Sequence, residues 1–320
     1  MACGLDSLGL EIHIFAIPGS QPTPNGFLHY VPECTLDNYW IYEQALIKFY
    51  KNMLKDEDFV WHDFCHTHII HDYIYWNHKS NVISTPWGVF IQRPFYRNHL
   101  VTWSRFQRGL AVQQGFPTST RYVHGGTNTE QFSPDPDKPY EKDGYFLFCA
   151  RMHPDKQPDL FLHLAEMFPS EQFVLAGSFG KHATPDHAYY GKIYAEMAQK
   201  LSNVKIERDP TKQKQIELYR RAKAVIHPSR SECFGLVIVE SLATGTPVIT
   251  SNEGAFPEII IEGKTGFLAS TIEQYVNAIK NVDVLSPEAC RKDAETRWNR
   301  RRVAEQYKQI YEDVLKGEVF

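Results

Sequence analysis

Short apolar runs alternate with segments of helical periodicity through the C-terminal half of the chain. YFLFCA (145–150) and FVLAG (173–177) have the length and composition of buried strands, and apolar residues recur at helical spacing over 160–168 between them. Further strand-like runs follow at NVKIE (203–207), AVIHPS (224–229) and PVITS (247–251). This alternation is typical of parallel α/β folds, so we expect a doubly wound, Rossmann-like domain over 140–299.

The chain has 320 residues, more than one domain of ordinary size. FSPDPDKPYEKDG (132–144) is rich in proline and acidic residues, which is typical of a linker. We therefore expect an N-terminal Rossmann-like domain that includes this linker over 1–139. Apolar residues at helical spacing after residue 300 predict a last helix, and we expect 300–320 to pack back on the N-terminal domain.

Composition and charge narrow the class of protein. The sequence is 42% hydrophobic and 22% charged with a net charge of −4, which is typical of a globular protein and argues against a nucleic-acid partner. Six cysteines without a C-x-x-C pair favour free thiols. The N-terminus lacks signal-peptide features and no apolar run reaches the length of a membrane span, so we expect a cytoplasmic protein. A basic cluster at Arg297 and 300–302 leaves membrane association open.

The stretch SRSECFGLVIVESLATGTPVIT (229–250) places two glutamates at the ends of an apolar run. Its pattern predicts a loop, a helix that starts near Gly235, and a strand. A helix start at the carboxyl edge of a parallel sheet favours an anion such as a diphosphate. Glu232 and Glu240 carry negative charge, so we expect them to accept hydrogen bonds from hydroxyls, which sugars and ribose supply.

The loop after the first strand of this half, in CARMHPDKQPD (149–159), holds Arg151 and Lys156. Both are positioned to bind phosphate oxygens, and the alternative is a surface ion pair with Asp155 or Asp159. Two carboxylates for hydroxyls and two cations for phosphates together predict a nucleotide-sugar site.

Downstream, Ser270 and Glu273 predict a capping box at the start of a helix.

An ordered set of motifs over about 145–270 resembles the family 4 retaining glycosyltransferases. The motifs are AGS (176–178), HPSRSE (227–232), FGLVIVE (234–240), ATGTPVIT (243–250), PEII (257–260) and GKTGFL (263–268), together with the R-x4-K of Arg151 and Lys156 and an E-x7-E pattern. The resemblance implies the GT-B fold, in which two Rossmann-like domains face each other across a cleft and the C-terminal domain binds a nucleotide-sugar donor.

The resemblance also implies roles for residues. Glu232 would contact hydroxyls of the transferred sugar and Glu240 the ribose, while Arg151 and Lys156 would neutralise the leaving diphosphate. The remaining donor-binding positions that it implies are Phe234, Gly235, Leu236, Gly177 and Ser178. No metal and no cofactor is implied beyond the nucleoside-diphosphate sugar itself. Transfer would proceed with retention of anomeric configuration and without an enzyme nucleophile.

The N-terminal part departs from the family pattern. ACGLDSLGLEIHIFA (2–16) resembles the end of the family's first helix and its second strand, so we expect the first strand and its glycine-rich loop to be missing. The alternative is that EIHIFAI (11–17) is the first strand and PGSQPTPNG (18–26) its loop. Trp87 in TPWG stands where many members carry a histidine near the donor sugar.

Some segments contain residue types that bind metal ions. Histidines and a cysteine crowd between His62 and His78, residue types that suit zinc, but their spacing matches no common ligand pattern. His62 at the end of the strand-like FVWHDF (59–64) is instead a candidate for lining the cleft. The D-x-D at 135–137 lies in the linker rather than after a strand, which disfavours a divalent-ion site.

These patterns predict a metal-independent, retaining transferase that moves a hexose-type sugar to an acceptor hydroxyl. The acceptor, whether glycan, lipid or small molecule, is not specified. Three alternatives remain: a sugar phosphorylase of the same fold, a non-catalytic nucleotide-sugar-binding protein, and a glycosidase that would use Glu232 and Glu240 as its acids. The glycosidase fits poorly because Glu240 lies in a helix and both glutamates neighbour the phosphate-binding cations.

Overall fold

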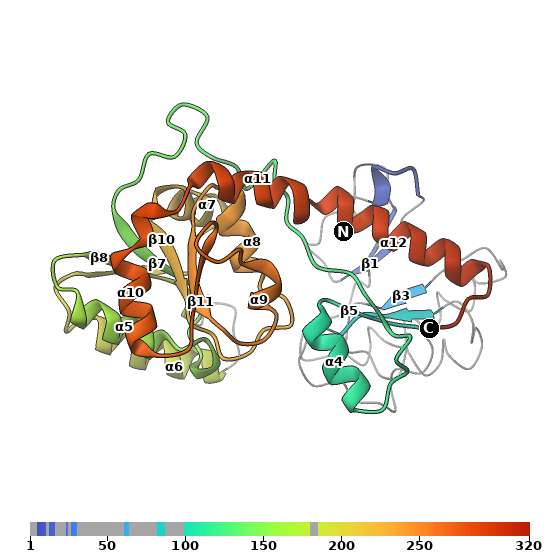
Figure 1. Ribbon diagram of the computed structural model, residues 1–320, viewed down its shortest axis with the longest axis horizontal. Coiled ribbons are helices and arrows are strands. Elements are labelled where there is room, and N and C mark those ends of the chain that lie inside the picture. Colours follow the sequence, from blue (N-terminus) through green and yellow to red (C-terminus); the bar gives the residue numbers. More distant parts are fainter. Residues whose placement is uncertain are drawn as a thin grey trace. The chain divides into compact units, whose positions relative to one another are not determined.

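The computed structural model describes residues 5–10, 13–16, 24, 27–30, 61–63, 82–86, 99–179 and 185–320. Contacts divide the chain into two compact units. Unit 1 comprises 1–125 and 300–320, and unit 2 comprises 126–299. Both units contain parallel sheets, and Figure 1 labels many of their strands and helices.

Unit 2 is built on one six-stranded sheet. Its strands are β7 (Tyr145–Arg151), β8 (Gln172–Ser178), β9 (Val204–Arg208), β10 (Ala224–His227), β11 (Val248–Ser251) and β12 (Gly266–Ala269). They lie in the order β12-β11-β10-β7-β8-β9, and every neighbouring pair is parallel. The chain therefore winds outward in one direction from β7 and in the other from β10. This arrangement confirms the predicted doubly wound fold.

Helices cover both faces of this sheet. They are α5 (Pro158–Met167), α6 (Pro185–Ala198), α7 (Lys212–Arg221), α8 (Leu236–Ala243), α9 (Phe256–Ile259), α10 (Ile272–Lys280) and α11 (Pro287–Arg297), with short 3₁₀ turns at η3 (Pro154–Lys156) and η4 (Val282–Val284). Residues of α5, α6 and α10 share one buried cluster with the strands, so these three helices lie on the same face. On the other face α8 packs against α7 and α11.

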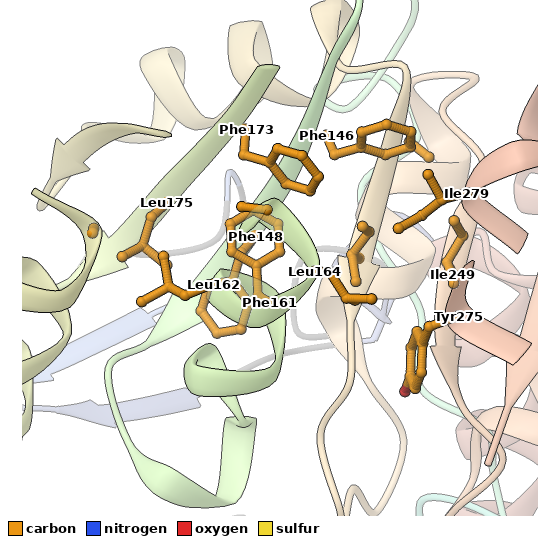
Figure 2. Packing of buried hydrophobic residues seen from close by; sticks show 14 of the residues in the cluster. Phe146, Phe148, Phe161, Leu162, Leu164, Phe173, Leu175, Ile249, Tyr275 and Ile279 are labelled. Carbon is orange, nitrogen blue, oxygen red and sulfur yellow. The ribbon is translucent and has the colours of Figure 1, made fainter. Parts of the chain in front are cut away.

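Aromatic side chains form the centre of that cluster, as Figure 2 shows. Phe148 and Phe173 on neighbouring strands both contact Phe161 of α5, with ring centroids 5.5 and 5.4 Å apart. All three are at most 1% exposed. The apolar spacing that predicted strand, helix and strand over 145–177 therefore corresponds to one packed layer. It holds the carboxyl end of β7 in a fixed position.

The proline-rich linker belongs to unit 2. Arg220 Nε donates to the carbonyl of Ser133 at 2.6 Å, and Arg221 forms a 2.7 Å ion pair with Asp135. Asp135 also accepts hydrogen bonds from the backbone N–H groups of Asp137 and Lys138, so it closes a turn. By their contacts the two units divide at 125/126, and the linker, which we expected to end the N-terminal domain at 139, lies in unit 2.

Unit 1 has a four-stranded parallel sheet in the order β3-β4-β5-β6 and a separate parallel pair, β1-β2. The strands are β1 (His13–Ala16), β2 (Phe27–Tyr30), β3 (Trp61–Asp63), β4 (Val82–Ser84), β5 (His99–Thr102) and β6 (Arg121–Tyr122), and the helices are α4 (Arg105–Gln113) and α12 (Arg300–Leu315). The parallel pairing of β1 with β2 does not test whether the family's first strand is present. The missing first strand therefore stays a prediction.

The last helix contributes to the core of unit 1. Tyr307 and Ile310 of α12 share a buried cluster with Ile83 of β4 and Val101 of β5. The hydroxyl groups of Tyr307 and Thr85 lie 3.3 Å apart. Unit 1 is thus completed by a segment that follows unit 2 in the sequence.

Among the helices of the described ranges, none has both the length and the apolar composition needed to cross a bilayer.

Candidate functional site

The centre of the unit 2 sheet is the point where the strand order reverses. β7 and β10 are neighbours there, and the segments that follow them lead to helices on opposite faces. Such a reversal leaves a crevice at the carboxyl ends of the strands, which is where doubly wound sheets bind ligands. Arg151 ends β7 and Lys156 lies in the η3 turn that follows it, while Glu232 lies in the loop between β10 and α8.

Lys156 and Glu232 form an ion pair across this crevice. Lys156 Nζ lies 2.5 Å from Glu232 Oε1, although the two residues are 76 positions apart in the chain. Asp155 Oδ2 is 3.5 Å from the same nitrogen. Lys156 is 7% exposed, so its ammonium group is largely removed from water. A cation and a carboxylate are therefore held within one hydrogen-bond length at the predicted ligand edge.

Hydrogen bonds to backbone carbonyl groups hold the loop after β7 and the loop after β10 together. The hydroxyl of Ser229 and the N–H of Arg230 both donate to the carbonyl of Asp155, at 3.1 and 3.0 Å. On the other side, the N–H of Ala255 donates to the carbonyl of Glu232 at 3.1 Å. Gly254 has φ +60°, and a Cβ there would lie 2.7 Å from that carbonyl oxygen. The backbone beside Glu232 thus needs glycine at 254.

His227 is a further residue of the site that the sequence analysis did not single out. Its Nε2 lies 3.4 Å from Glu232 Oε1, and the residue is 1% exposed. Its ring stacks on Phe148 and meets Phe256 edge-on, with centroid distances of 6.3 and 5.7 Å. The sequence did contain a signal for His227, because this residue is the first of the HPSRSE motif and lies at the end of a predicted strand. His227, at the buried end of β10, therefore positions the Glu232 carboxylate.

The surroundings of Glu232 keep its carboxylate ionised. Burial by itself raises the pKa of Glu232, but the hydrogen bond and charge of His227 and those of Lys156 outweigh burial and lower this pKa to about 2. An ionised carboxylate has acceptors only. Glu232 can therefore accept hydrogen bonds from hydroxyl groups of a ligand at any physiological pH.

Glu240 has different partners from Glu232. It lies in α8, its side chain is 14% exposed, and its Oε1 is 3.8 Å from Lys212 Nζ. The hydroxyl of Tyr219 donates to its Oε2 at 3.4 Å. Burial raises the pKa of Glu240 despite the opposing effects of Lys212 and Tyr219. The sequence analysis did not single out Lys212 and Tyr219 as site residues. They are seven positions apart and therefore lie on one face of α7.

The start of α8 is shaped by Gly235. This residue has φ +105°, and a Cβ there would lie 2.8 Å from a ring atom of Phe256. No side chain caps the helix at this position. Phe234 is buried with its ring 5.6 Å from that of Trp298, whereas the side chain of Leu236 is 40% exposed. Any contribution of 234–236 to anion binding would therefore come from backbone N–H groups, and it stays a prediction.

Arg151 lies beside the AGS motif. In the β7–β8 register Arg151 pairs with Ser178 and Ala150 with Gly177. Gly177 has φ +140°, and a Cβ there would lie 1.7 Å from the carbonyl oxygen of Ala150. Gly177 is thus required by the backbone itself. Arg151 is exposed, and its positive charge acts on Asp155. Burial raises the pKa of Asp155, but Lys156, His153 and Arg151 together lower it.

Two predicted cleft residues fall outside this description. Trp87 lies outside the described residues, and for His62 the structure describes only the backbone, in β3. Within the described ranges, no three His, Cys, Asp or Glu side chains come together as a metal site would require. The cysteines there, Cys149, Cys233 and Cys290, are buried free thiols. Metal independence stays a prediction.

Comparison with known proteins shows what the chain resembles. Residues 130–294 match the model of the family described as "Glycosyl transferases group 1". The chain is 27% identical over 180 residues to the D-inositol 3-phosphate glycosyltransferase of Mycobacteroides abscessus, a match that covers 53% of this chain and 40% of that protein. The matched part thus spans well under half the length of this curated relative.

Solved structures resemble the chain over much more of its length. A glycosyltransferase from Rickettsia africae superposes with a TM-score of 0.76 at 17% identity, covering 99% of this chain and 93% of that one. Anabaena Alr3699/HepE, solved in complex with UDP and glucose, gives a TM-score of 0.70 at 14% identity over 90% of this chain and 86% of that one. These likenesses confirm the predicted GT-B fold of two Rossmann-like units.

Proposed function

Because this chain belongs to the group 1 glycosyl transferases, we propose that it transfers a hexose-type sugar from a nucleoside-diphosphate sugar to an acceptor hydroxyl with retention. The observation that carries the proposal is the Lys156–Glu232 ion pair at the point where the strand order reverses. It provides one cation for phosphate and one carboxylate for sugar hydroxyls at the same edge of the sheet.

The leaving group is stabilised by positive charge. As the bond between sugar C1 and the phosphate oxygen breaks, negative charge develops on the departing diphosphate. An ammonium group has three N–H donors, so Lys156 can hold Glu232 and still donate to a phosphate oxygen. Arg151 adds a second cation, and the uncapped N–H groups at the start of α8 add partial positive charge. These groups supply what a divalent ion would supply elsewhere, which supports metal independence.

The two glutamates bind hydroxyl groups. Glu232, kept ionised and oriented by His227, accepts hydrogen bonds from the transferred sugar. Glu240 lies about one turn into α8 and accepts from the ribose hydroxyls. The departing phosphate takes the proton of the acceptor hydroxyl as the new bond to C1 forms, so no enzyme nucleophile is needed.

The comparisons suggest the first substrates to test. HepE was solved with UDP and with UDP-glucose, which makes UDP the first donor nucleotide to try. The name of the mycobacterial relative specifies inositol 3-phosphate as the acceptor of that protein.

Calorimetric titration with UDP, GDP and ADP tests the donor site. We expect one nucleotide to bind the wild type and to bind Lys156→Ala about 10-fold or more weakly, since a hydrogen bond to a charged group contributes about 1.5–3 kcal/mol. Lys200→Ala, an exposed lysine of the same unit, is the matched control and should change affinity less than about 2-fold. Thermal unfolding of each variant shows whether it is folded.

Turnover of the matching donor separates the candidate functions. Transfer to an added alcohol or polyol with retained configuration supports the proposal. Nucleotide binding without turnover favours a non-catalytic nucleotide-sugar-binding protein, and phosphate-dependent cleavage of a disaccharide favours a phosphorylase. If none of the three nucleotides binds the folded wild type, the diphosphate site proposed at Lys156 is wrong.

A further inference from the structure

One face of α7 carries a row of polar side chains beside Glu240 of α8. They are Lys212, Gln215 and Tyr219, at positions i, i+3 and i+7 of the helix. Residues at this spacing lie on one side of an α-helix. Because α7 packs against α8, this side meets the neighbouring helix. The proposed transfer reaction uses Glu240 itself but gives these three side chains no role.

The hydroxyl group of Tyr219 directs its proton at Glu240. Gln215 Nε2 donates to the hydroxyl oxygen at 3.1 Å, and the hydroxyl donates to Glu240 Oε2 at 3.4 Å. The same amide nitrogen donates to Cys149 Sγ at 3.6 Å, which fixes the amide group. Burial raises the pKa of Tyr219 well above its ordinary value, so the phenol keeps its proton. An amide donor on one side and a carboxylate on the other leave that proton one direction.

Lys212 lies beside the other oxygen of the same carboxylate. Its Nζ is 3.8 Å from Glu240 Oε1, the distance of an ion pair rather than of a hydrogen bond. The ammonium group also lies 5.2 Å from the centroid of the Phe132 ring, whose face attracts a cation. The lysine side chain is 53% exposed, yet these two contacts hold its charge near the carboxylate.

The Glu240 carboxylate is held at both oxygens and still has acceptors to spare. Since Lys212 is next to Oε1 and Tyr219 bonds to Oε2, rotating the carboxylate would lose at least one contact. An ionised carboxylate has about four lone-pair directions, and Tyr219 uses one of them. The side chain is 14% exposed, so it is not sealed from a ligand. The remaining directions suit two adjacent hydroxyls, which ribose carries at its 2′ and 3′ positions.

We propose that Lys212 and Tyr219 position the Glu240 carboxylate for the donor ribose, so that the site selects ribonucleotides over deoxyribonucleotides. This inference rests on the proposed function, in which Glu240 accepts from the ribose hydroxyls. Tyr219 is 0% exposed, so it acts through Glu240 and not on the ligand. Lys212 opposes the effect of burial on the pKa of Glu240 and thereby favours the ionised form, which accepts hydrogen bonds only.

Calorimetric titration of the full chain with two ligands tests the inference. The ligands are whichever of UDP, GDP and ADP binds, and the 2′,3′-dideoxy analogue of that nucleotide. We expect the wild type to bind the ribonucleotide about 10-fold or more tightly than the analogue. Tyr219→Phe and Lys212→Met should each weaken ribonucleotide binding about 2- to 10-fold and change analogue binding less than about 2-fold. The analogue has no hydroxyl for Glu240, whereas a folding defect would weaken both ligands alike.

Conservative and matched variants serve as controls. Lys212→Arg keeps a cation and should recover most of the affinity that is lost in Lys212→Met. Lys214→Met removes a lysine of the same helix that pairs with Glu217 instead. Tyr275→Phe removes another buried hydroxyl, which has no hydrogen-bond partner among the residues that the structure describes. Neither Lys214→Met nor Tyr275→Phe should change the affinity for either ligand.

Glu240→Gln separates a failure of this inference from a failure of the proposed function. If Glu240→Gln loses the preference for the ribonucleotide while Tyr219→Phe and Lys212→Met keep it, Glu240 binds the ribose unaided and the inference is wrong. If Glu240→Gln keeps the preference too, the role proposed for Glu240 is wrong and the inference is wrong with it. Equal weakening of both ligands in Tyr219→Phe and Lys212→Met would also overturn the inference. If no nucleotide binds the wild type, the proposed function is wrong, and the inference with it.

Discussion

Glu232 and Glu240 belong to one sequence motif but have opposite electrostatic environments. Glu232 is close to a buried lysine and a buried histidine, which lower its pKa to about 2. Glu240 is buried with weaker partners, and its pKa is raised. The same side chain therefore contributes to stability with opposite dependence on pH at the two positions.

For Glu232→Gln we expect a loss of stability that is largest near neutral pH and shrinks in acid. The folded-state pKa of about 2 lies below the ordinary 4.5. The carboxylate therefore contributes stability that is fully present above about pH 4.5 and is lost as the pH falls toward about 2. Urea unfolding of the wild type and the variant between about pH 7 and about pH 3 measures this difference. A difference that stays constant over that range would show that the ion pair does not lower this pKa.

Glu240→Gln should show the opposite trend. Because the folded-state pKa is raised, the folded protein binds this proton more tightly than the unfolded chain does. Wild-type stability at this site is thus lost as the pH rises above about 4.5. We expect the glutamine variant to gain stability relative to the wild type between about pH 4 and about pH 7. The same unfolding series measures this difference. If the glutamine variant instead gained stability relative to the wild type as the pH fell, the raised pKa would be contradicted.

At the scale of the element, β8 carries its own requirement for glycine. Gly177→Ala combines φ +140° with a Cβ only 1.7 Å from a carbonyl oxygen, so we expect it to cost more than about 2 kcal/mol of unfolding free energy. Gly144→Ala is the control, since its φ is +85° but no atom lies within 4 Å of the added Cβ. That variant should lose only about 1 kcal/mol. Equal losses in urea unfolding would mean that β8 relaxes to accept the methyl group.

The start of α10 shows how tertiary structure selects between two local signals. The sequence fits a capping box at Ser270 and Glu273 and equally at Thr271 and Gln274, one residue later. The structure uses the second: Thr271 accepts from the N–H of Gln274, and Gln274 accepts from the N–H of Thr271. The expected cap at Ser270 was therefore wrong by one residue. The later register turns Tyr275 and Ile279 into the core.

At the scale of the whole molecule, the chain order and the structural order differ. α12 follows unit 2 in the sequence but completes the core of unit 1. Unit 1 therefore cannot acquire its full core until the last residues of the chain are available. Its stability depends on a segment more than 170 residues away from β6.

We expect Ile310→Ala to weaken unit 1 specifically. Ile310 is 5% exposed in the core that α12 shares with β4 and β5, and truncating a buried isoleucine costs about 2–5 kcal/mol. Hydrogen exchange should therefore speed up in β5 and in α12 but not in β7 or β8. Leu315→Ala, at an exposed position of the same helix, is the control and should change neither. Faster exchange in β7 would show that the two units unfold together.

Much of unit 2 and its motif residues could be predicted from the sequence. Strand and helix patterns are local, because a buried parallel strand needs a continuous apolar run and the helix after it needs an apolar stripe. A ligand edge follows from this order of elements, since parallel strands bring the loops after them to one edge. For these reasons Lys156, Glu232 and Gly235 were correctly assigned to the loops or helix starts of that edge, whereas Arg151 is the last residue of β7 rather than part of the loop after it.

Only the tertiary structure decided which of these groups meet. The 2.5 Å pair of Lys156 with Glu232, the placement of His227 beneath it, and the separate environment of Glu240 each join segments distant in the sequence. The same is true of the linker that belongs to unit 2. Local periodicity fixes which face of an element is buried. Distances between side chains depend on how whole elements pack, and no local pattern encodes them.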